Sequence, residues 1–106
     1  MQSVYIGNGK LIKDKQTVES YTDMKIILTA GDNNTVNVEV LESNGESFFS
    51  TASRYDIKKR GKGFYLSLHG IPSAMITIDS NNNLIYYHPK VNIDGDIYTL
   101  QINAVR

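Results

Sequence analysis

The chain is dominated by short runs in which apolar and polar residues alternate, and the clearest group extends from Gly63 to His88. Because side chains alternate across a strand with a period of two, each run can turn one apolar face toward a core. Turn signals at 70–72 and 79–83 separate three such runs, which predicts a meander of three antiparallel strands. The apolar faces consist of Phe64, Leu66 and Leu68; then Ala74, Ile76 and Ile78; then Leu84 and Tyr86. Ile76 is expected to be buried.

The same alternation predicts further strands on both sides of this meander. We expect strands at 24–30, 35–41, 47–52 and 97–103, with turns at 31–34, 43–46 and 92–96. Near the N-terminus, Gly7-Asn8-Gly9 predicts a tight hairpin, because an Asn-Gly pair supplies the positive φ angles that such a turn needs. Residues 14–23 fit a strand better than a short helix, because they contain several β-branched and aromatic residues. Pro89 is expected to end the strand that begins near Leu84.

Residues 53–62 interrupt the alternation. Ser53 followed by Asp56 resembles a capping box, which predicts one helical turn there. The remaining pattern gives about eight strands at a spacing of roughly 8–12 residues, which is typical of an all-β protein. A chain of 106 residues is expected to form a single domain. Eight short strands must protect their edges, so we predict a small antiparallel meander barrel, with a β-sandwich as the alternative.

The composition of the chain excludes several classes of protein. Cysteine is absent, which excludes a disulfide scaffold, thiol catalysis and thiolate metal sites. The N-terminal residues show no basic region followed by an apolar core, so no signal peptide is expected and the cytoplasm is the expected compartment. A mature secreted chain that carries a new Met1 would look the same. The longest aliphatic run is Ile26-Ile27-Leu28, too short to cross a bilayer, so no membrane association is expected.

No catalytic or metal-binding motif is present. The two histidines, His69 and His88, are not linked by a pattern such as H-E-x-x-H. The sequence from Asp79 begins like a calcium loop, but Leu84 and Lys90 stand where an EF-hand needs glycine and glutamate. We therefore expect a protein that is not an enzyme and that has no catalytic residues, metal or cofactor.

A cluster of positive charge is the strongest candidate for a functional site. The net charge is zero, with 11 basic and 11 acidic residues, yet residues 54–62 contain five basic residues and one acidic residue. The candidate partner-binding residues are Arg54, Tyr55, Lys58, Lys59, Arg60, Lys62 and Tyr65. Arginine and tyrosine are common at protein interfaces, and clustered cations complement an acidic surface. The first hypothesis is a binding module that blocks or scaffolds a protein partner with an acidic patch, such as an inhibitor-type protein of a bacterium or phage.

Two alternatives use the same fold differently. In an OB-like barrel, the basic segment would follow the phosphates of single-stranded nucleic acid while Tyr55 or Tyr65 stacks on bases. The zero net charge argues against this reading, because nucleic-acid-binding domains are usually basic. An eight-stranded barrel can also carry a small molecule. In a further interpretation, the charges of residues 54–62 only increase the solubility of the protein.

Overall fold

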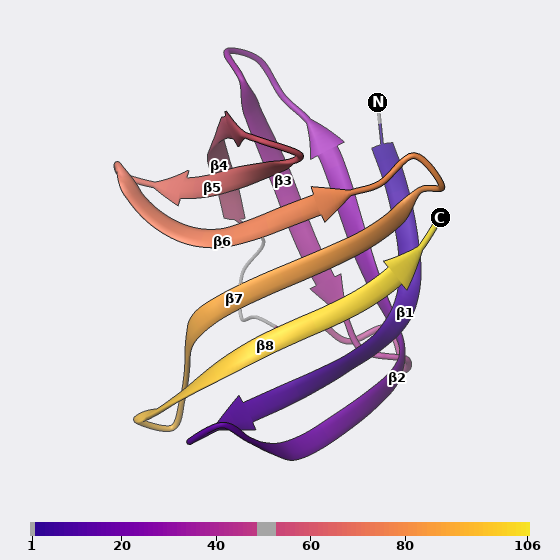
Figure 1. The fold of residues 1–106 in the computed structure, drawn as a ribbon, viewed down its shortest axis with the longest axis vertical. Helices are drawn as coiled ribbons and strands as arrows, with labels where there is room; N and C mark the ends of the chain where they lie inside the picture. The colour runs from indigo at the N-terminus through magenta and orange to yellow at the C-terminus, as the bar shows by residue number, and fades with distance from the viewer. Residues whose placement is uncertain (1, 49–52) are drawn as a thin grey trace.

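In the computed structural model, which describes residues 2–48 and 53–106, the chain forms a closed antiparallel barrel of eight strands. The strands are β1 (Gln2–Lys13), β2 (Gln16–Ala30), β3 (Thr35–Leu41), β4 (Ser53–Arg60), β5 (Gly63–Leu68), β6 (Ile71–Ile78), β7 (Asn83–Ile93) and β8 (Asp96–Val105). Each strand pairs with the next one along the chain, and β8 pairs with β1 to close the barrel (Figure 1). The predicted meander barrel is confirmed.

Alternation places most of the predicted apolar faces inside the barrel, but Leu68, which was predicted to share the inner face of Phe64 and Leu66, is exposed. Val36, Val38 and Val40 of β3 are buried, and Leu100 and Ile102 are buried on β8. The prediction for Ile76 is confirmed, since its side chain is 2% exposed. Among the described residues, the buried core contains only aliphatic, methionine and tyrosine side chains. The barrel is therefore a packed core.

The predicted hairpin at Gly7-Asn8-Gly9 is wrong, because β1 continues through these residues. Both glycines lie on the inward-facing side of β1, where a Cβ atom on Gly7 would overlap the backbone of Asn103 on β8. A Cβ on Gly9 would collide with the side chain of Met24. The pairing of β1 with β2 shifts register between Gly7 and Gly9. The glycines therefore allow close approach at a bend of the barrel, which is another common use of glycine in strands.

The turn that joins β1 to β2 lies instead at Asp14-Lys15. Both residues have positive φ angles, 53° and 66°, and Lys13 pairs with Gln16 across the turn. This is the backbone twist that a two-residue hairpin requires. Residues 16–23 belong to β2, so the preference for a strand over a helix is confirmed for them. The turns predicted at 31–34 and 43–46 are also present. The turn predicted at 92–96 is shorter and consists of Asp94-Gly95, because β7 continues to Ile93 and β8 begins at Asp96.

The helical turn predicted after Ser53 is wrong as well. Asp56 pairs with Thr35 on β3 and with Ser67 on β5, so this segment is strand β4. Ladder hydrogen bonds on both sides satisfy more backbone groups than one capped turn could. Ser47 forms an isolated bridge with Leu41, while residues 49–52 of the strand predicted at 47–52 lie outside the described residues.

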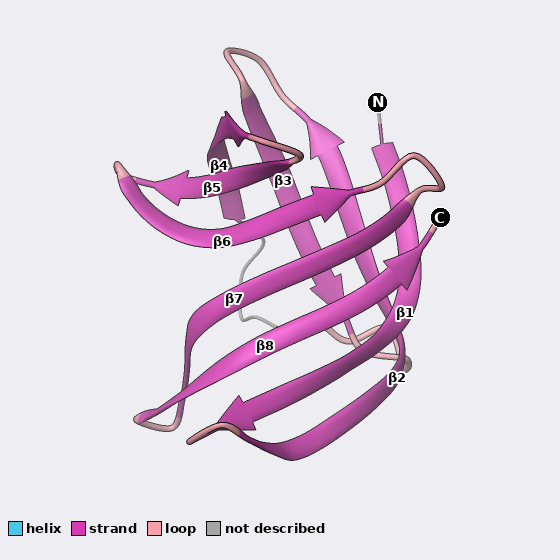
Figure 2. Cartoon of the chain, viewed as in Figure 1, coloured by secondary structure: helices cyan, strands magenta, loops and turns pink. Residues whose placement is uncertain are grey.

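Pro89 does not end its strand, contrary to the prediction. Strand β7 continues to Ile93, and its pairing with β8 shifts register between His88 and Val91. A proline lacks the N–H that a ladder needs, and a bulge is one of the few strand positions that accepts it. The part of the chain that the structure describes contains no helix (Figure 2), and so no helix long and apolar enough to span a membrane.

Candidate partner-binding surface

Strand β4 divides the predicted binding residues between its two faces. Tyr55 points into the core and is only 8% exposed. Arg54, Lys58 and Arg60 are exposed and alternate with Tyr55 and Ile57, which places them on the outer face. Tyr55 therefore cannot serve as a stacking or contact residue in this fold, contrary to the sequence-based hypothesis.

The two remaining lysines lie at one end of the barrel. Lys59 follows Tyr55 and Ile57 on the inward-facing side of β4, but β4 ends at Arg60, so its side chain is exposed. Lys62 lies in the turn between β4 and β5 and is also exposed. The predicted cluster is thus split into an outer group and an end group.

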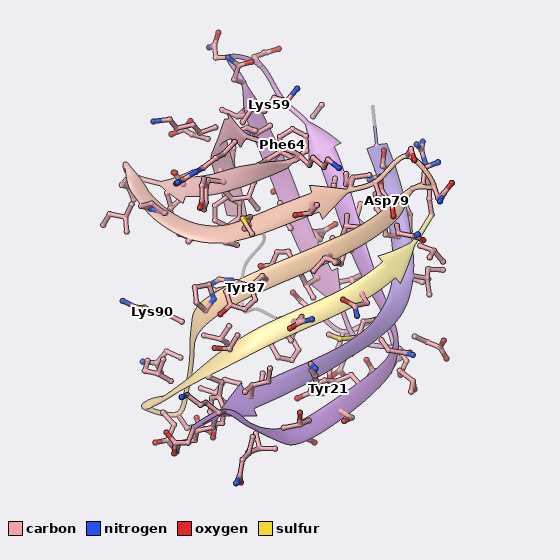
Figure 3. The ribbon with its side chains drawn as sticks, in the orientation of Figure 1. Tyr21, Lys59, Phe64, Asp79, Tyr87 and Lys90 are labelled. Atoms are coloured by element: carbon pink, nitrogen blue, oxygen red, sulfur yellow. The ribbon has the colours of Figure 1, made fainter. Side chains whose placement is uncertain are left out.

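The outer group meets a row of side chains that crosses the sheet. Lys58 pairs with Tyr65 on β5, Tyr65 with Met75 on β6, and Met75 with Tyr87 on β7. Because directly paired residues of antiparallel strands share one face of the sheet, these side chains lie side by side on the outside of the barrel. Figure 3 labels Tyr87 on the outer side of β7.

Arg60 is tied to this row through Tyr65. Its guanidinium group lies 5.4 Å from the centre of the Tyr65 ring, and Nη1 donates a hydrogen bond of 3.4 Å to the Tyr65 hydroxyl oxygen. A cation–π contact at an exposed site contributes roughly 0.5–1 kcal/mol. The pair holds an aromatic ring and a positive charge together on the same surface.

A shallow apolar hollow extends from Tyr65 toward β7. It has a volume of about 190 Å³, and its lining includes Tyr65, Pro72, Met75, Tyr87 and Pro89. We call these five residues the Tyr65–Tyr87 surface. A second hollow of about 650 Å³ adjoins it at Tyr65 and Pro72, and is otherwise lined by Ser67 and by Lys58, Lys59 and Arg60.

Sequence reasoning found Tyr65 but missed the other four members of this surface. Met75 and Tyr87 occupy the positions between inward-facing residues of their strands, which is the available signal. The pairing of β6 with β7 ends at Met75 and Tyr87, so among the described residues Ile71 to Ala74 have no β7 partner. The two prolines lie where these strands diverge, which leaves the hollow open.

No protein-family model, curated protein or solved structure matches the chain.

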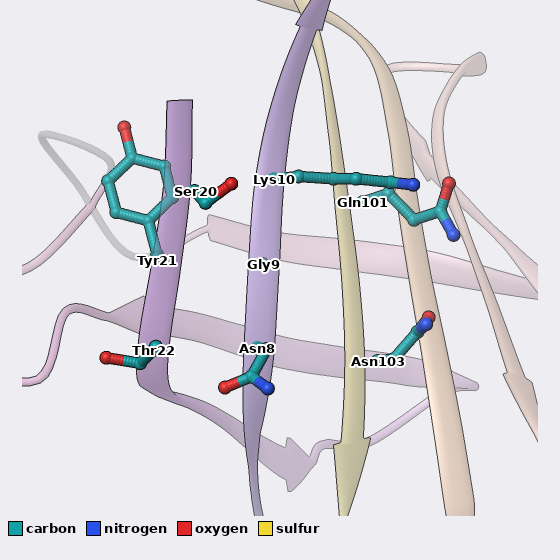
Figure 4. A pocket seen from close by; sticks show the side chains of 8 residues that line it. All are labelled: Asn8, Gly9, Lys10, Ser20, Tyr21, Thr22, Gln101 and Asn103. Carbon is teal, nitrogen blue, oxygen red and sulfur yellow. The ribbon is translucent and has the colours of Figure 1, made fainter. Parts of the chain in front are cut away.

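A polar hollow lies elsewhere on the outer face, over β1, β2 and β8 (Figure 4). It has a volume of about 370 Å³ and is lined by Asn8, Gly9, Lys10, Ser20, Tyr21, Thr22, Gln101 and Asn103. Most of its lining side chains end in amide or hydroxyl groups, so it offers several hydrogen-bonding partners.

The histidines do not form a metal site with acidic residues. His69 lies exposed in the turn between β5 and β6, with a positive φ angle of 52°. His88 is half-buried on β7, and its Nδ1 lies 3.0 Å from the hydroxyl oxygen of buried Tyr86. Burial lowers the pKa of His88 and raises the pKa of Tyr86. Within residues 2–48 and 53–106, no three His, Asp or Glu side chains are grouped closely enough to hold a metal ion.

Proposed function

We propose that this protein is a non-enzymatic binding module that docks on a protein partner through the Tyr65–Tyr87 surface. The observation that carries the proposal is the outward-facing row of half-buried Tyr65 and Met75 and exposed Tyr87, which lies beside the cations of β4. The acidic patch of the partner would meet Lys58 and Arg60, while its apolar residues would cover the two tyrosines.

The composition of this surface supports a protein partner. Protein interfaces combine an apolar centre with a polar rim and are enriched in tyrosine, methionine and arginine. Here the apolar hollow forms the centre, and Lys58, Arg60 and Ser67 form part of the rim. Tyr87 is 40% exposed, so its ring is available for burial by a partner. Aromatic anchors of this kind often contribute most of the binding energy.

A capture experiment tests the proposal. The protein is immobilised and exposed to an extract of its host, the retained protein is identified, and its affinity is measured with purified components. Tyr87→Ser should weaken binding by roughly 2 kcal/mol or more if Tyr87 is an anchor. Lys58→Glu together with Arg60→Glu should slow association, with an effect that shrinks at high salt.

A matched control lies on the far side of the barrel. Lys25 is an exposed residue of β2 and precedes buried Ile26, so it points outward from a strand that lies opposite β6 in the circular strand order. Lys25→Glu should leave binding unchanged. Loss of binding in Lys25→Glu, with full binding in the β4 and Tyr87 variants, would place the partner on another face.

Single-stranded nucleic acid is a second candidate ligand for the same surface. The positions of Tyr65 and Tyr87 in one row favour it, because they are two strands and hence roughly 10 Å apart, with Met75 between them. Aromatic side chains on a sheet can stack on successive bases, and Lys58 could contact phosphate. A labelled oligonucleotide should then bind at low salt and dissociate steeply as salt rises. Absence of binding at micromolar protein would eliminate this candidate.

A further inference from the structure

At one end of the barrel, the inward-facing side chains become gradually more exposed toward the turns. The turns at 31–34, 61–62 and 79–82 surround this end. Along the inward-facing side of β4, Tyr55 is buried, Ile57 is half-buried and Lys59 is exposed. On β2, buried Ile26 is followed by half-buried Leu28. The inner face therefore changes from closed core to open rim within a few residues.

A small apolar hollow lies inside this rim. Its volume is about 100 Å³, and its lining consists of Leu28, Val36, Ile57, Phe64, Leu66 and Ile76. Cavities of about 150 Å³ with aliphatic and aromatic linings stay dry and can bind a molecule as large as benzene. At about 100 Å³, the hollow at this barrel end is smaller than such a cavity and has room for only a few methylene groups.

The rim above the hollow carries positive charge. A wider, open hollow of about 530 Å³ adjoins the apolar one at Phe64 and is lined by Lys59, Gly61, Lys62, Phe64, Ile78, Asp79 and Ser80. Lys59 pairs directly with Phe64, so a cation stands beside the ring that separates the two hollows. Figure 3 labels Lys59 and Phe64 next to each other in its upper part, and Asp79 farther to the right, near the end of β6.

Asp79, the acidic residue on this rim, is hydrogen-bonded within its own turn. One carboxylate oxygen of Asp79 accepts hydrogen bonds of 2.8 and 2.9 Å from the backbone N–H groups of Asn81 and Asn83. The other oxygen accepts one of 3.0 Å from the side-chain amide of Asn83. These bonds hold the pKa of Asp79 below its usual range. Asp79 keeps its negative charge, so this rim carries two ammonium groups against one carboxylate, and the excess of one positive charge favours an added anion.

We propose that this end of the barrel binds an amphipathic monocarboxylate with a short to medium alkyl chain. The alkyl chain would contact Phe64 and enter the apolar hollow, while the carboxylate would lie between Lys59 and Lys62. A neutral chain of the same length lacks the charge contact, and a short carboxylate lacks the apolar contact. Both parts of the ligand are needed because the hollow is small and the lysines are exposed to solvent.

Titration with acetate, butyrate, hexanoate and octanoate, followed by NMR of backbone amides, tests the proposal. Chemical-shift changes should concentrate at Ile57, Gly61, Lys62, Phe64 and Ile76. Affinity should rise by roughly three- to fourfold for each added CH₂ until the hollow is full. Equal affinity for acetate and octanoate, or shift changes spread over the whole barrel, would overturn the proposal.

Adjacent lysines on opposite faces of β4 provide a matched control. Changing Lys59 and Lys62 together to methionine should weaken octanoate binding about fivefold and leave octanamide binding nearly unchanged. Lys58→Met, on the outer face, should have no effect on octanoate. A loss of the same size in Lys58→Met would contradict the site. Because the partner-binding surface uses the outer face, failure of either proposal leaves the other standing.

Discussion

Lys58 and Lys59 illustrate how much one position along a strand changes the role of a residue. Lys58 pairs with Tyr65 on the outer face, whereas Lys59 pairs with Phe64 at the barrel end. If the segment were a loop, the two lysines would form one charge cluster. In the strand, Lys58 lines only the outer hollow, whereas Lys59 lines both the outer hollow and the barrel end. Since the side-chain period of a strand is two, any substitution experiment on this segment must treat neighbouring residues separately.

Ile76 provides the test of the core at the level of one residue. Ile76→Ala should lower the free energy of unfolding by about 2–5 kcal/mol, because it removes buried methyl groups and leaves a cavity. For a domain of about 100 residues, this corresponds to a fall of roughly 10 °C or more in the thermal midpoint. Lys59→Ala is the control and should change the midpoint little, since exposed substitutions rarely exceed about 0.5 kcal/mol. A wild-type midpoint for Ile76→Ala would contradict the observed register.

His88 should make folding stability depend on pH. Burial lowers the pKa of His88 in the folded state, whereas an unfolded histidine titrates near about 6.5. As pH falls below about 6.5, the unfolded chain therefore binds more protons than the folded chain, and stability decreases until the folded pKa is passed. Protonation would also make Nδ1 of His88 a hydrogen-bond donor toward the Tyr86 hydroxyl, which lies 3.0 Å away.

Thermal unfolding between pH 7.5 and pH 5.5 measures this effect. The midpoint should fall over this interval, and His88→Gln should reduce the fall. His69→Asn is the control, because His69 lies exposed in a turn whose positive φ angle asparagine tolerates. If His88→Gln retains the full pH dependence, another group is responsible for it.

At the level of the strand, the hairpin at Asp14-Lys15 is a point of local strain. Both residues adopt left-handed backbone conformations, in which a side chain typically costs about 1–2 kcal/mol. Replacing the pair by Asn-Gly should raise the thermal midpoint by about 2–5 °C, since the gain is partly offset by the greater freedom of glycine in the unfolded chain.

Lys10→Gly is the matched control for this substitution. Lys10 is an exposed residue in the middle of β1, paired with Ser20 and Gln101, where glycine should lower stability by roughly 0.5–1 kcal/mol. Stabilisation by Asn-Gly at the turn and destabilisation by glycine in the strand would together confirm that the turn residues are strained. A lower midpoint for the Asn-Gly variant would argue against that conformation.

At the level of the whole molecule, the ladders that close the barrel differ in extent. The β1–β2 ladder extends from Gln2 to Lys13 of β1, whereas β6 pairs with β7 only over Met75 to Ile78. Local opening requires less free energy where fewer backbone hydrogen bonds and apolar contacts must break. Amides of Ile71 to Ala74 should therefore exchange with solvent sooner than those of Met75 to Ile78 and of central β1.

Hydrogen exchange followed by mass spectrometry measures this order directly. Pro72 has no amide proton, so the comparison depends on Ile71, Ser73 and Ala74. Slower exchange at these positions than in central β1 would contradict the expectation that the wall opens more easily beside the short β6–β7 ladder. If the order holds, the Tyr65–Tyr87 surface lies over one of the more easily opened parts of the wall.

The sequence alone determined the fold class, most strand positions and the core positions of β3, β6 and β8. These features depend on the alternation of neighbouring residues, which is a local property of the chain. Ile76 and Val38 therefore pointed to the interior before any strand pairing was known.

Only the tertiary structure decided the role of the glycines at 7 and 9 and which side chains of residues 54–60 face inward or outward. It alone also placed Tyr65 and Tyr87 in one row across the sheet. Glycine is common both in turns and where two backbones approach each other closely, so the residue type alone does not distinguish these roles. The close approach of Asn103 to Gly7 also depends on residues that are almost a hundred positions apart in the sequence. Likewise, Tyr65, Met75 and Tyr87 become neighbours through the register of three strands. Register follows from how the whole barrel packs, so no single stretch of sequence contains it.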